Sequence, residues 1–331
     1  MPKTIVWSPK KILELGNMWL PATLHTAVKL GIFDAIGDRS ATLVAVMQKT
    51  KTSQHGTEPL LNALAAAGLL IKKNNQYRNT SVSKNFLCSN SKKYLGASLL
   101  HHHYLMHSWI HLDQSVTTGK AIRHRATSQN PAQRTAFYQA MNATGLRVAP
   151  LLAKKLNFKE MRTLLDLGGG PATYACHFCL HNPQLKAFVF DLGFAKAHAQ
   201  KNINQFKMQK RVSFIEGNYL TDPLPGQYDA IFLSHILHAE SPERCQLMIQ
   251  KAVRALNPGG KILIQEFVMN DNKDGPLFPA LFALNMLIGT DGGTAYSQKE
   301  IAVLLKAAGV NKIRHLPFIM PNGASVICAT V

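Results

Sequence analysis

A glycine-rich turn at Leu165–Ala172, which reads Leu-Asp-Leu-Gly-Gly-Gly-Pro-Ala, is the feature that most limits how this chain can fold. The apolar residues before the turn predict a buried strand, and the residues after it predict a helix. Glycine has no Cβ, so the backbone can adopt positive φ angles and pass close to a ligand. The free N–H groups of the following helix point toward the same place. The turn therefore predicts a nucleotide-like ligand, and the alternative is a tight strand–helix turn that binds nothing.

The second half of the chain alternates between predicted strands and predicted helices. Such alternation produces a doubly wound parallel sheet, whose ligands bind beyond the carboxyl ends of the strands. We therefore expect the fold class α/β, with a Rossmann-like sheet domain over residues 156–331. The predicted strands are Thr163–Leu167, Ala187–Asp191, Val212–Glu216, Ala230–Ser234 and Lys261–Glu266.

Residues 1–100 predict helices followed by a short hairpin, an order that resembles a winged helix. The helix that would enter a DNA groove, Glu58–Ala67, contains no Lys or Arg. Base recognition needs Arg, Lys, Asn or Gln on that helix, and Asn62 is the one such side chain there. We therefore expect a packing or dimerisation surface and no nucleic-acid partner. Residues 101–155 predict a helical linker. The elements expected in the first domain are helices at Leu20–Leu30, Thr42–Thr50 and Leu60–Ala67, the last opened by Thr57 and Pro59, and strands at Leu69–Lys72 and Gln76–Thr80 around an Asn74-Asn75 turn.

The composition favours a two-domain cytoplasmic protein. The chain has 331 residues, of which 46% are hydrophobic, enough for two buried cores. The longest apolar stretch, Leu277–Gly289, is shorter than the roughly 20 residues of a membrane-spanning helix. Met1–Lys11 lacks the apolar segment of a secretory signal, and five scattered cysteines suit reduced thiols. The net charge of +19 either attracts acidic partners or is a solvated basic surface, and we favour the second.

Polar side chains at the ends of successive predicted strands indicate how a ligand is held. Asp191 ends the second strand, where a carboxylate can accept both hydroxyls of a ribose. Asn218 and Tyr219 follow the third strand, where an amide can bond the adenine amine and a ring can cover the base. Ser234 ends the fourth strand and faces the same edge of the sheet. The alternatives are a helix cap for Asp191 and an ordinary turn for Asn218.

His238 follows the fourth strand, at the mouth of the predicted site. An imidazole titrates near neutral pH and therefore suits a general base. The fifth strand ends in Glu266, and adjacent strand ends can bring its carboxylate to His238, as in a catalytic triad. A second histidine, His235, lies three residues before His238. The alternative for both is a packing role, which we favour for His235.

Two further patterns have the spacing of metal ligands. His103, His107 and His111 recur on one helix face, but only Asp113 lies near them. Cys176 and Cys179 form a close pair inside a predicted helix, without a second pair at zinc-ribbon spacing. We therefore expect no metal site.

Motifs along nearly the whole chain, in the order DLGGG, FDL, EGN, LHAESPERC, NPGGKILIQE and GGTAYSQKE, resemble the small-molecule O-methyltransferases. That family includes caffeate, hydroxyindole (acetylserotonin) and bacterial polyketide enzymes. The resemblance implies S-adenosylmethionine as cofactor, an N-terminal dimerisation domain, a homodimer, and a small aromatic metabolite with a hydroxyl as acceptor. It implies His238 as the general base and Glu266 as its partner.

The resemblance also implies which residues line the two ligand sites. Plain helix core is the alternative for the acceptor residues, because Met and Phe at helical spacing usually pack. Methyl transfer to nitrogen, carbon or RNA, and a non-catalytic winged-helix regulator, are the alternatives to O-methyl transfer. The implied cofactor residues are Gly168, Gly170, Asp191, Leu192, Asn218, Tyr219 and Ser234, and the implied acceptor residues are Phe137, Met141, Asn285 and Met286.

Overall fold

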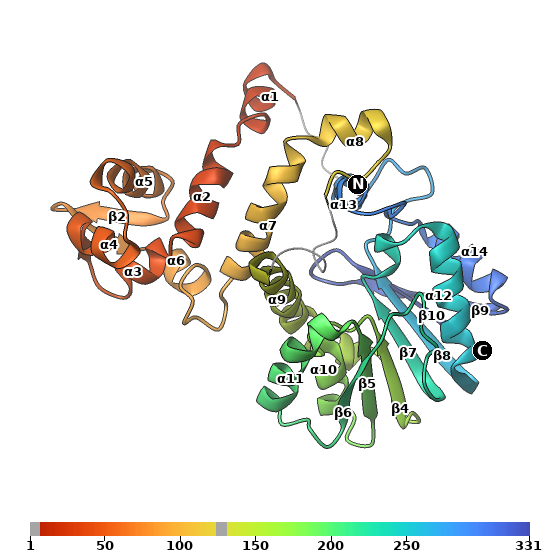
Figure 1. Cartoon of the computed structure of the whole chain (residues 1–331). Helices are drawn as coiled ribbons and strands as arrows, with labels where there is room; N and C mark the ends of the chain where they lie inside the picture. The colour runs from red at the N-terminus through yellow and green to blue at the C-terminus, as the bar shows by residue number, and fades with distance from the viewer. Residues whose placement is uncertain (1–6, 124–130) are drawn as a thin grey trace. The chain divides into compact units, whose positions relative to one another are not determined.

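The computed structural model describes residues 7–123 and 131–331 and divides into two compact units, Met1–Leu105 and Met106–Val331 (Figure 1). Each unit is described by itself. The expectation that Met1–Lys11 is not a secretory signal falls partly on residues 1–6, which lie outside the described residues. Residues 124–130, which belong to the expected linker, also lie outside them.

The first unit is a set of short helices with a small antiparallel sheet of strand order β1-β3-β2. Asn74 and Asn75 both have positive φ angles, 49° and 57°, as a two-residue hairpin turn requires, so the predicted hairpin is confirmed. Its elements are α1 (Pro9–Leu15), α2 (Trp19–Lys29), α3 (Ile32–Ile36), β1 (Ala41–Thr42), α4 (Leu43–Thr50), α5 (Gln54–Ala66), β2 (Leu70–Lys73), β3 (Gln76–Asn79), α6 (Ser81–Phe86) and the first part of α7 (Gly96–Trp109).

The start of α5 corrects the sequence expectation. The helix was expected to open at Thr57 and Pro59, but it begins at Gln54, after Ser53, whose hydroxyl accepts a hydrogen bond from the backbone N–H of Gly56. Proline usually opens a helix because it lacks an N–H. Here Pro59 lies inside the helix, so the serine cap rather than the proline sets the start.

The second unit contains a seven-stranded sheet of order β6-β5-β4-β7-β8-β10-β9 in the described part of the chain. The five strands predicted from the sequence are present and mutually parallel, whereas β9 and β10 were not predicted. Strand β10 runs antiparallel to both neighbours. The strands are β4 (Thr163–Leu167), β5 (Lys186–Asp191), β6 (Val212–Glu216), β7 (Tyr228–Ser234), β8 (Leu256–Glu266), β9 (Lys312–Ile319) and β10 (Ser325–Thr330).

Helices cover both faces of this sheet, α10 and α11 on one side and α12 and α14 on the other (Figure 1). Each face of the sheet has its own hydrophobic core, and alternate residues of β7 point into the two cores. Phe232 packs in the core beneath α10, and Ile231 packs in the core beneath α12. The helical elements are α8 (Leu112–Thr118), α9 (Pro131–Lys155), α10 (Thr173–His181), η2 (Gly193–Ala195), α11 (Lys196–Gln205), η3 (Leu237–Ala239), α12 (Pro242–Arg254), α13 (Leu277–Gly289) and α14 (Gln298–Ala307).

The strand order reverses between β4 and β7, and this reversal positions the site. The chain leaves β4 toward β5 on one side and leaves β7 toward β8 on the other. Loops that diverge in this way open a crevice at the carboxyl ends of the two strands. Among the described residues, no helix is both long enough and apolar enough to cross a membrane.

Candidate active site

The glycine turn links β4 to α10 through three residues with positive φ, namely Gly168 (69°), Gly170 (50°) and Ala172 (62°). A Cβ on Gly168 would lie 2.7 Å from Ile236, so this position needs glycine for space as well as for conformation. At Gly170 the nearest atoms to such a Cβ would be 3.8 Å away. The turn is therefore closed against the loop after β7 and open at Gly170.

Asp191, at the end of β5, is hydrogen-bonded to the glycine turn at Gly170. Its Oδ2 accepts a hydrogen bond from the backbone N–H of Gly170 at 2.7 Å, and its Oδ1 accepts one from Leu192 at 2.6 Å. Burial raises the pKa of Asp191 to about 6, against the effect of these two donors. Each oxygen keeps a further lone pair for a ligand. The structure thus brings Gly170, Asp191 and Leu192 together, as the sequence analysis expected for a cofactor site.

Two buried polar groups beside the turn were not identified from the sequence. Asp166 is fully buried, and neither of its carboxylate oxygens has a well-formed hydrogen bond to a described residue. Burial raises its pKa to about 7, a shift that the backbone N–H of Ala175 opposes and Asp191 reinforces. Tyr138 of α9 lies beside Gly170 and Asp191, and its buried hydroxyl also has no partner among the described residues. Unpaired buried carboxylate and hydroxyl oxygens fit a ligand that carries positive charge and N–H or O–H donors.

The residues after β6 form a turn of their own. Asn218 accepts a hydrogen bond from the backbone N–H of Leu220 through its side-chain oxygen at 2.9 Å, so that oxygen is engaged in the turn. Tyr219 donates its hydroxyl to the fully buried Glu240 at 2.7 Å, which fixes the ring. Ser234 donates to the side-chain oxygen of Gln265 at 3.3 Å, between the ends of β7 and β8.

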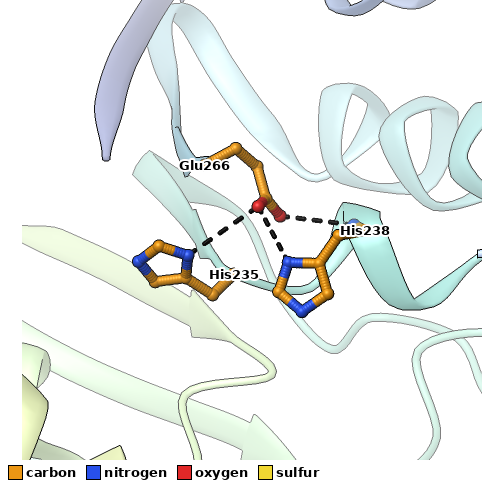
Figure 2. Close-up of side chains that lie close together, drawn as sticks. All are labelled: His235, His238 and Glu266. Atoms are coloured by element: carbon orange, nitrogen blue, oxygen red, sulfur yellow. Dashed lines mark hydrogen bonds and ion pairs between the residues drawn. The ribbon is translucent and has the colours of Figure 1, made fainter. Parts of the chain in front are cut away.

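His238 and Glu266 meet at the ends of β7 and β8 (Figure 2). Nδ1 of His238 lies 2.8 Å from Oε2 of Glu266, and the backbone N–H of His238 donates to Oε1 at 3.4 Å. The side chain of Glu266 is only 3% exposed. Burial alone would raise the pKa of Glu266, but the His238 and His235 imidazoles outweigh it and hold that pKa well below its usual range. The carboxylate is therefore ionised and fixes the proton of His238 on Nδ1, which leaves the lone pair of Nε2 for a proton.

Aromatic rings surround this histidine. Phe282 of α13 meets the His238 ring edge to face, with centroids 4.7 Å apart. Phe267 lies 5.0 Å from Phe282 and 4.9 Å from Phe278. His235 packs on Phe267 at 4.3 Å, as its expected packing role requires. The sequence analysis missed these three phenylalanines. Phe278 and Phe282 belong to the apolar run Leu277–Gly289, and such a run looks the same whether it faces a core or a pocket.

The expected acceptor residues lie on two helices. Asn285 of α13 accepts hydrogen bonds through Oδ1 from Trp109 and Arg123, both at 3.2 Å, so its amide N–H₂ remains available as a donor. Met286, on the same helix, is buried, with 7% of its surface exposed. Phe137 and Met141 lie one turn apart on α9 and are half-buried.

The sequence analysis noted two patterns with the spacing of metal ligands, a cysteine pair and a histidine series. Cys176 and Cys179 are both buried, free thiols in α10. His103, His107 and His111 do not belong to a group of metal ligands within the described residues, where the one such group is His235, His238 and Glu266.

Comparisons with known proteins identify the family. Two family models match the chain. The model of the O-methyltransferase domain matches residues 109–311, and the model of the O-methyltransferase dimerisation domain matches residues 13–89. The chain belongs to the O-methyltransferase family. The expected resemblance and fold class, a Rossmann-like methyltransferase domain after an N-terminal dimerisation domain, are confirmed.

Similar proteins cover almost the whole length of this O-methyltransferase. The 3-hydroxy-5-methyl-1-naphthoate 3-O-methyltransferase of Streptomyces sahachiroi is 28% identical over 326 residues, which are 96% of this chain and 94% of that enzyme. The acetylserotonin O-methyltransferase of Homo sapiens is 28% identical over 310 residues, 86% of this chain and 87% of that enzyme. The solved structure of PigF with SAH has a TM-score of 0.90 at 25% identity and covers 98% of this chain and 100% of that one. The cofactor of the family is S-adenosylmethionine, as expected.

Proposed function

We propose that this O-methyltransferase transfers the methyl group of S-adenosylmethionine to a hydroxyl of a small planar aromatic metabolite, with His238 as general base. The observation that carries the proposal is the hydrogen bond from His238 to the buried Glu266, which leaves Nε2 free as a base among aromatic rings. A phenol is a poor nucleophile until it loses its proton, so a base at this point serves the chemistry.

The protein's own groups move one proton. Nε2 of His238 takes the proton of the acceptor hydroxyl, and Glu266 stabilises the imidazolium that forms through Nδ1. When bound, the cofactor supplies an electrophilic methyl group on a sulfonium. The step leaves a protonated His238 on the protein. The aromatic rings around it would keep water away from the acceptor oxygen.

The cofactor residues proposed from the sequence have defined tasks in this site. Gly168 and Gly170 would let the backbone approach the ligand, and Asp191 and Leu192 would hold the ribose. Tyr219, whose hydroxyl is held by Glu240, and the turn at Asn218 would contact the adenine. Ser234 completes the wall between β7 and β8.

Asp166 and Tyr138 extend that set. The buried carboxylate of Asp166, which has no well-formed hydrogen bond, suits the positive charge of the cofactor's methionine portion. The unpaired hydroxyl of Tyr138 suits a polar group near the ribose. A Cβ on Gly169 would lie 2.5 Å from the carboxyl carbon of Asp166, so the glycine at this position is what leaves room for the carboxylate.

The acceptor class follows from the rings around His238. Phe267, Phe278 and Phe282 favour a flat aromatic acceptor that stacks or meets ring edges. The free amide N–H₂ of Asn285 supplies a donor for an oxygen of that acceptor. We propose Phe137, Met141 and Met286 as further contacts. The naphthoate and acetylserotonin relatives support bicyclic hydroxyaromatic acceptors.

The proposal is tested by incubating the protein with labelled S-adenosylmethionine and a panel of hydroxynaphthoates, hydroxyindoles and simple phenols. We expect methyl ethers from the bicyclic compounds, identified by mass spectrometry, and no label on matched methoxy compounds whose hydroxyl is already blocked. Label on an amine, a carbon atom or added RNA would instead support the alternatives. Cofactor binding without transfer to any panel member would contradict the acceptor class.

We also propose a cytoplasmic homodimer with domains at residues 1–100, 101–155 and 156–331. The five cysteines are free, which suits a reducing compartment. Helices α1 and α2 expose large apolar side chains, among them Leu13 (76% exposed) and Trp19 (80%). A second copy of the chain is the partner that the matched dimerisation domain favours.

Replacement of Leu13 and Trp19 by lysine is expected to convert the dimer into a monomer. The double variant puts charge on an apolar face and removes the area that two copies would bury. Sedimentation velocity measures the change. Val303→Lys, at an exposed apolar position on α14 (58% exposed), is the control for an added surface lysine and should stay dimeric. A wild-type monomer, or a double variant that remains dimeric, would contradict this interface.

A further inference from the structure

The neighbourhood of Glu266 contains a second imidazole that the proposed reaction does not use. Nδ1 of His235 lies 3.7 Å from Oε2 of Glu266, the same oxygen that bonds His238, and both rings turn Nδ1 toward it (Figure 2). At this separation the contact is too long for a well-formed hydrogen bond, so the buried Nδ1 of His235 faces Glu266 only as a long ion-pair contact. The three ligand atoms all lie within 4.8 Å of one another.

Two imidazole nitrogens and one carboxylate oxygen form a donor set that suits zinc and related transition-metal ions. Bonds of about 2.0–2.2 Å place the ligands of a tetrahedral ion roughly 3.3 Å apart. The Nδ1 atoms of His238 and His235 lie 2.8 and 3.7 Å from Oε2 of Glu266, on either side of that value. Small side-chain movements would therefore bring the three atoms to the spacing of metal ligands. Backbone geometry fixes His235 in this position, because its φ of 56° is left-handed and its N–H donates to Gln265 at 2.9 Å.

We propose that His235, His238 and Glu266 bind a divalent transition-metal ion of the zinc type, and that this ion inhibits methyl transfer. In the metal-free site the hydrogen bond to Glu266 favours the tautomer of the His238 imidazole whose proton is on Nδ1. A metal ion takes the lone pair of Nδ1, so that proton moves to Nε2 and the ring stays neutral. Nε2 then carries an N–H and cannot accept the proton of the acceptor. The inhibition rests on the proposed role of His238, whereas the binding does not.

Asn322 controls how readily His235 joins the site. Its side-chain oxygen accepts a hydrogen bond from the backbone N–H of Ala324 at 3.2 Å, so its N–H₂ faces Nε2 of His235 at 3.3 Å. This donor favours the tautomer of His235 with a proton on Nδ1, which weakens a metal bond there. A carboxylate at position 322 would accept a proton on Nε2 and free Nδ1 for the ion, the arrangement that orients many metal-bound histidines. Asn322→Asp should therefore bind the ion more tightly than the wild type.

The experiment uses the full-length, tag-free protein after removal of metal by chelating resin. Cobalt(II) is titrated and followed by visible absorption, and zinc inhibition is measured relative to each variant's own metal-free rate. We expect one ion per chain. His235→Asn, whose new side chain tolerates the left-handed backbone, should weaken binding at least tenfold, and Asn322→Asp should strengthen it about tenfold. Inhibition should shift in the same order.

Each other outcome overturns a defined part of the proposal. Cobalt binding by His235→Asn equal to that of the wild type, or weaker binding by Asn322→Asp, would exclude this site. The exposed His111 serves as a control, and His111→Asn should bind like the wild type. Specific binding that leaves turnover unchanged would contradict both the inhibition and His238 as the base. Failure of cobalt to bind the wild type would overturn only the metal site, because the base role needs no metal.

Discussion

Replacement of His238 by glutamine is expected to lower kcat by about 10²–10⁴-fold, the usual contribution of a general base. The carboxamide can still contact Glu266 and fill much of the space of the ring, but it cannot accept the hydroxyl proton. The affinity for S-adenosylmethionine should stay within about twofold, because no described contact links His238 to Asp191 or the glycine turn. Steady-state kinetics with a bicyclic hydroxyaromatic and calorimetric titration of the cofactor measure the two quantities.

A second acceptor separates a lost base from a damaged site. A nitro-substituted phenol is already ionised at the assay pH and needs no base, so the deficit of His238→Gln should shrink greatly with it. A structural defect would reduce turnover of both acceptors equally. His111→Gln, at an exposed histidine, is the matched control and should retain wild-type rates. Retained turnover in His238→Gln, or a loss of cofactor affinity as large as the loss of rate, would exclude the base role.

The cofactor side of the site was predictable because it depends on local sequence. We could identify the glycine turn, the strand-end carboxylate and the strand-end histidine from a few neighbouring residues each. Parallel strands then bring their carboxyl ends to one edge of the sheet. The pairing of His238 with Glu266 follows from the adjacency of β7 and β8 alone. Strands β9 and β10 were missed because no helix separates them, so the alternation that identified the other strands does not extend to them.

The acceptor side was not predictable in the same way. Phe282 meets His238 only because α13 packs against η3 after β7, a contact between segments about 45 residues apart in sequence that no local pattern encodes. His235 was expected to pack, and it does, but its left-handed backbone also turns Nδ1 toward Glu266. Asp166 lies inside an apolar strand, where sequence alone does not distinguish a bonded carboxylate from an unpaired one.

Asp166→Asn is expected to stabilise the cofactor-free protein at pH 8 while weakening cofactor binding. Burial raises the pKa of Asp166 to about 7. A carboxyl group whose folded pKa is raised contributes its stability below the unfolded value of about 3.9 and loses it as the pH rises through 7. At pH 8 the ionised form therefore costs on the order of 2–4 kcal/mol, which the neutral, equally sized asparagine avoids. At pH 5 the folded wild-type carboxyl is neutral and only the ionisation of the unfolded chain remains as a cost, so the difference in melting temperature should be much smaller than at pH 8.

The cofactor reverses this preference, since its positive charge compensates the buried carboxylate and favours the ionised form. The wild type should release a proton on binding near pH 7 and bind more tightly at pH 8 than at pH 6, whereas Asp166→Asn should lose at least tenfold in affinity at pH 8 together with that pH dependence. Thermal melts with and without cofactor, and calorimetry in two buffers of different ionisation enthalpy, measure both effects.

Asp229 provides a control of opposite sign. Burial alone would raise the pKa of Asp229, but its hydrogen bonds from Arg162, Thr163 and Asn257 lower it. Its contribution to stability is therefore present above the unfolded pKa, and Asp229→Asn should lower the melting temperature at pH 8 without changing the pH dependence of cofactor binding. Destabilisation by Asp166→Asn as well would mean that the Asp166 carboxylate has partners in the free protein and is not held ready for a cation. Stabilisation together with unchanged affinity would place the cofactor's charge elsewhere, so only the combination of a more stable free protein and weaker binding supports Asp166 as the anion that S-adenosylmethionine neutralises.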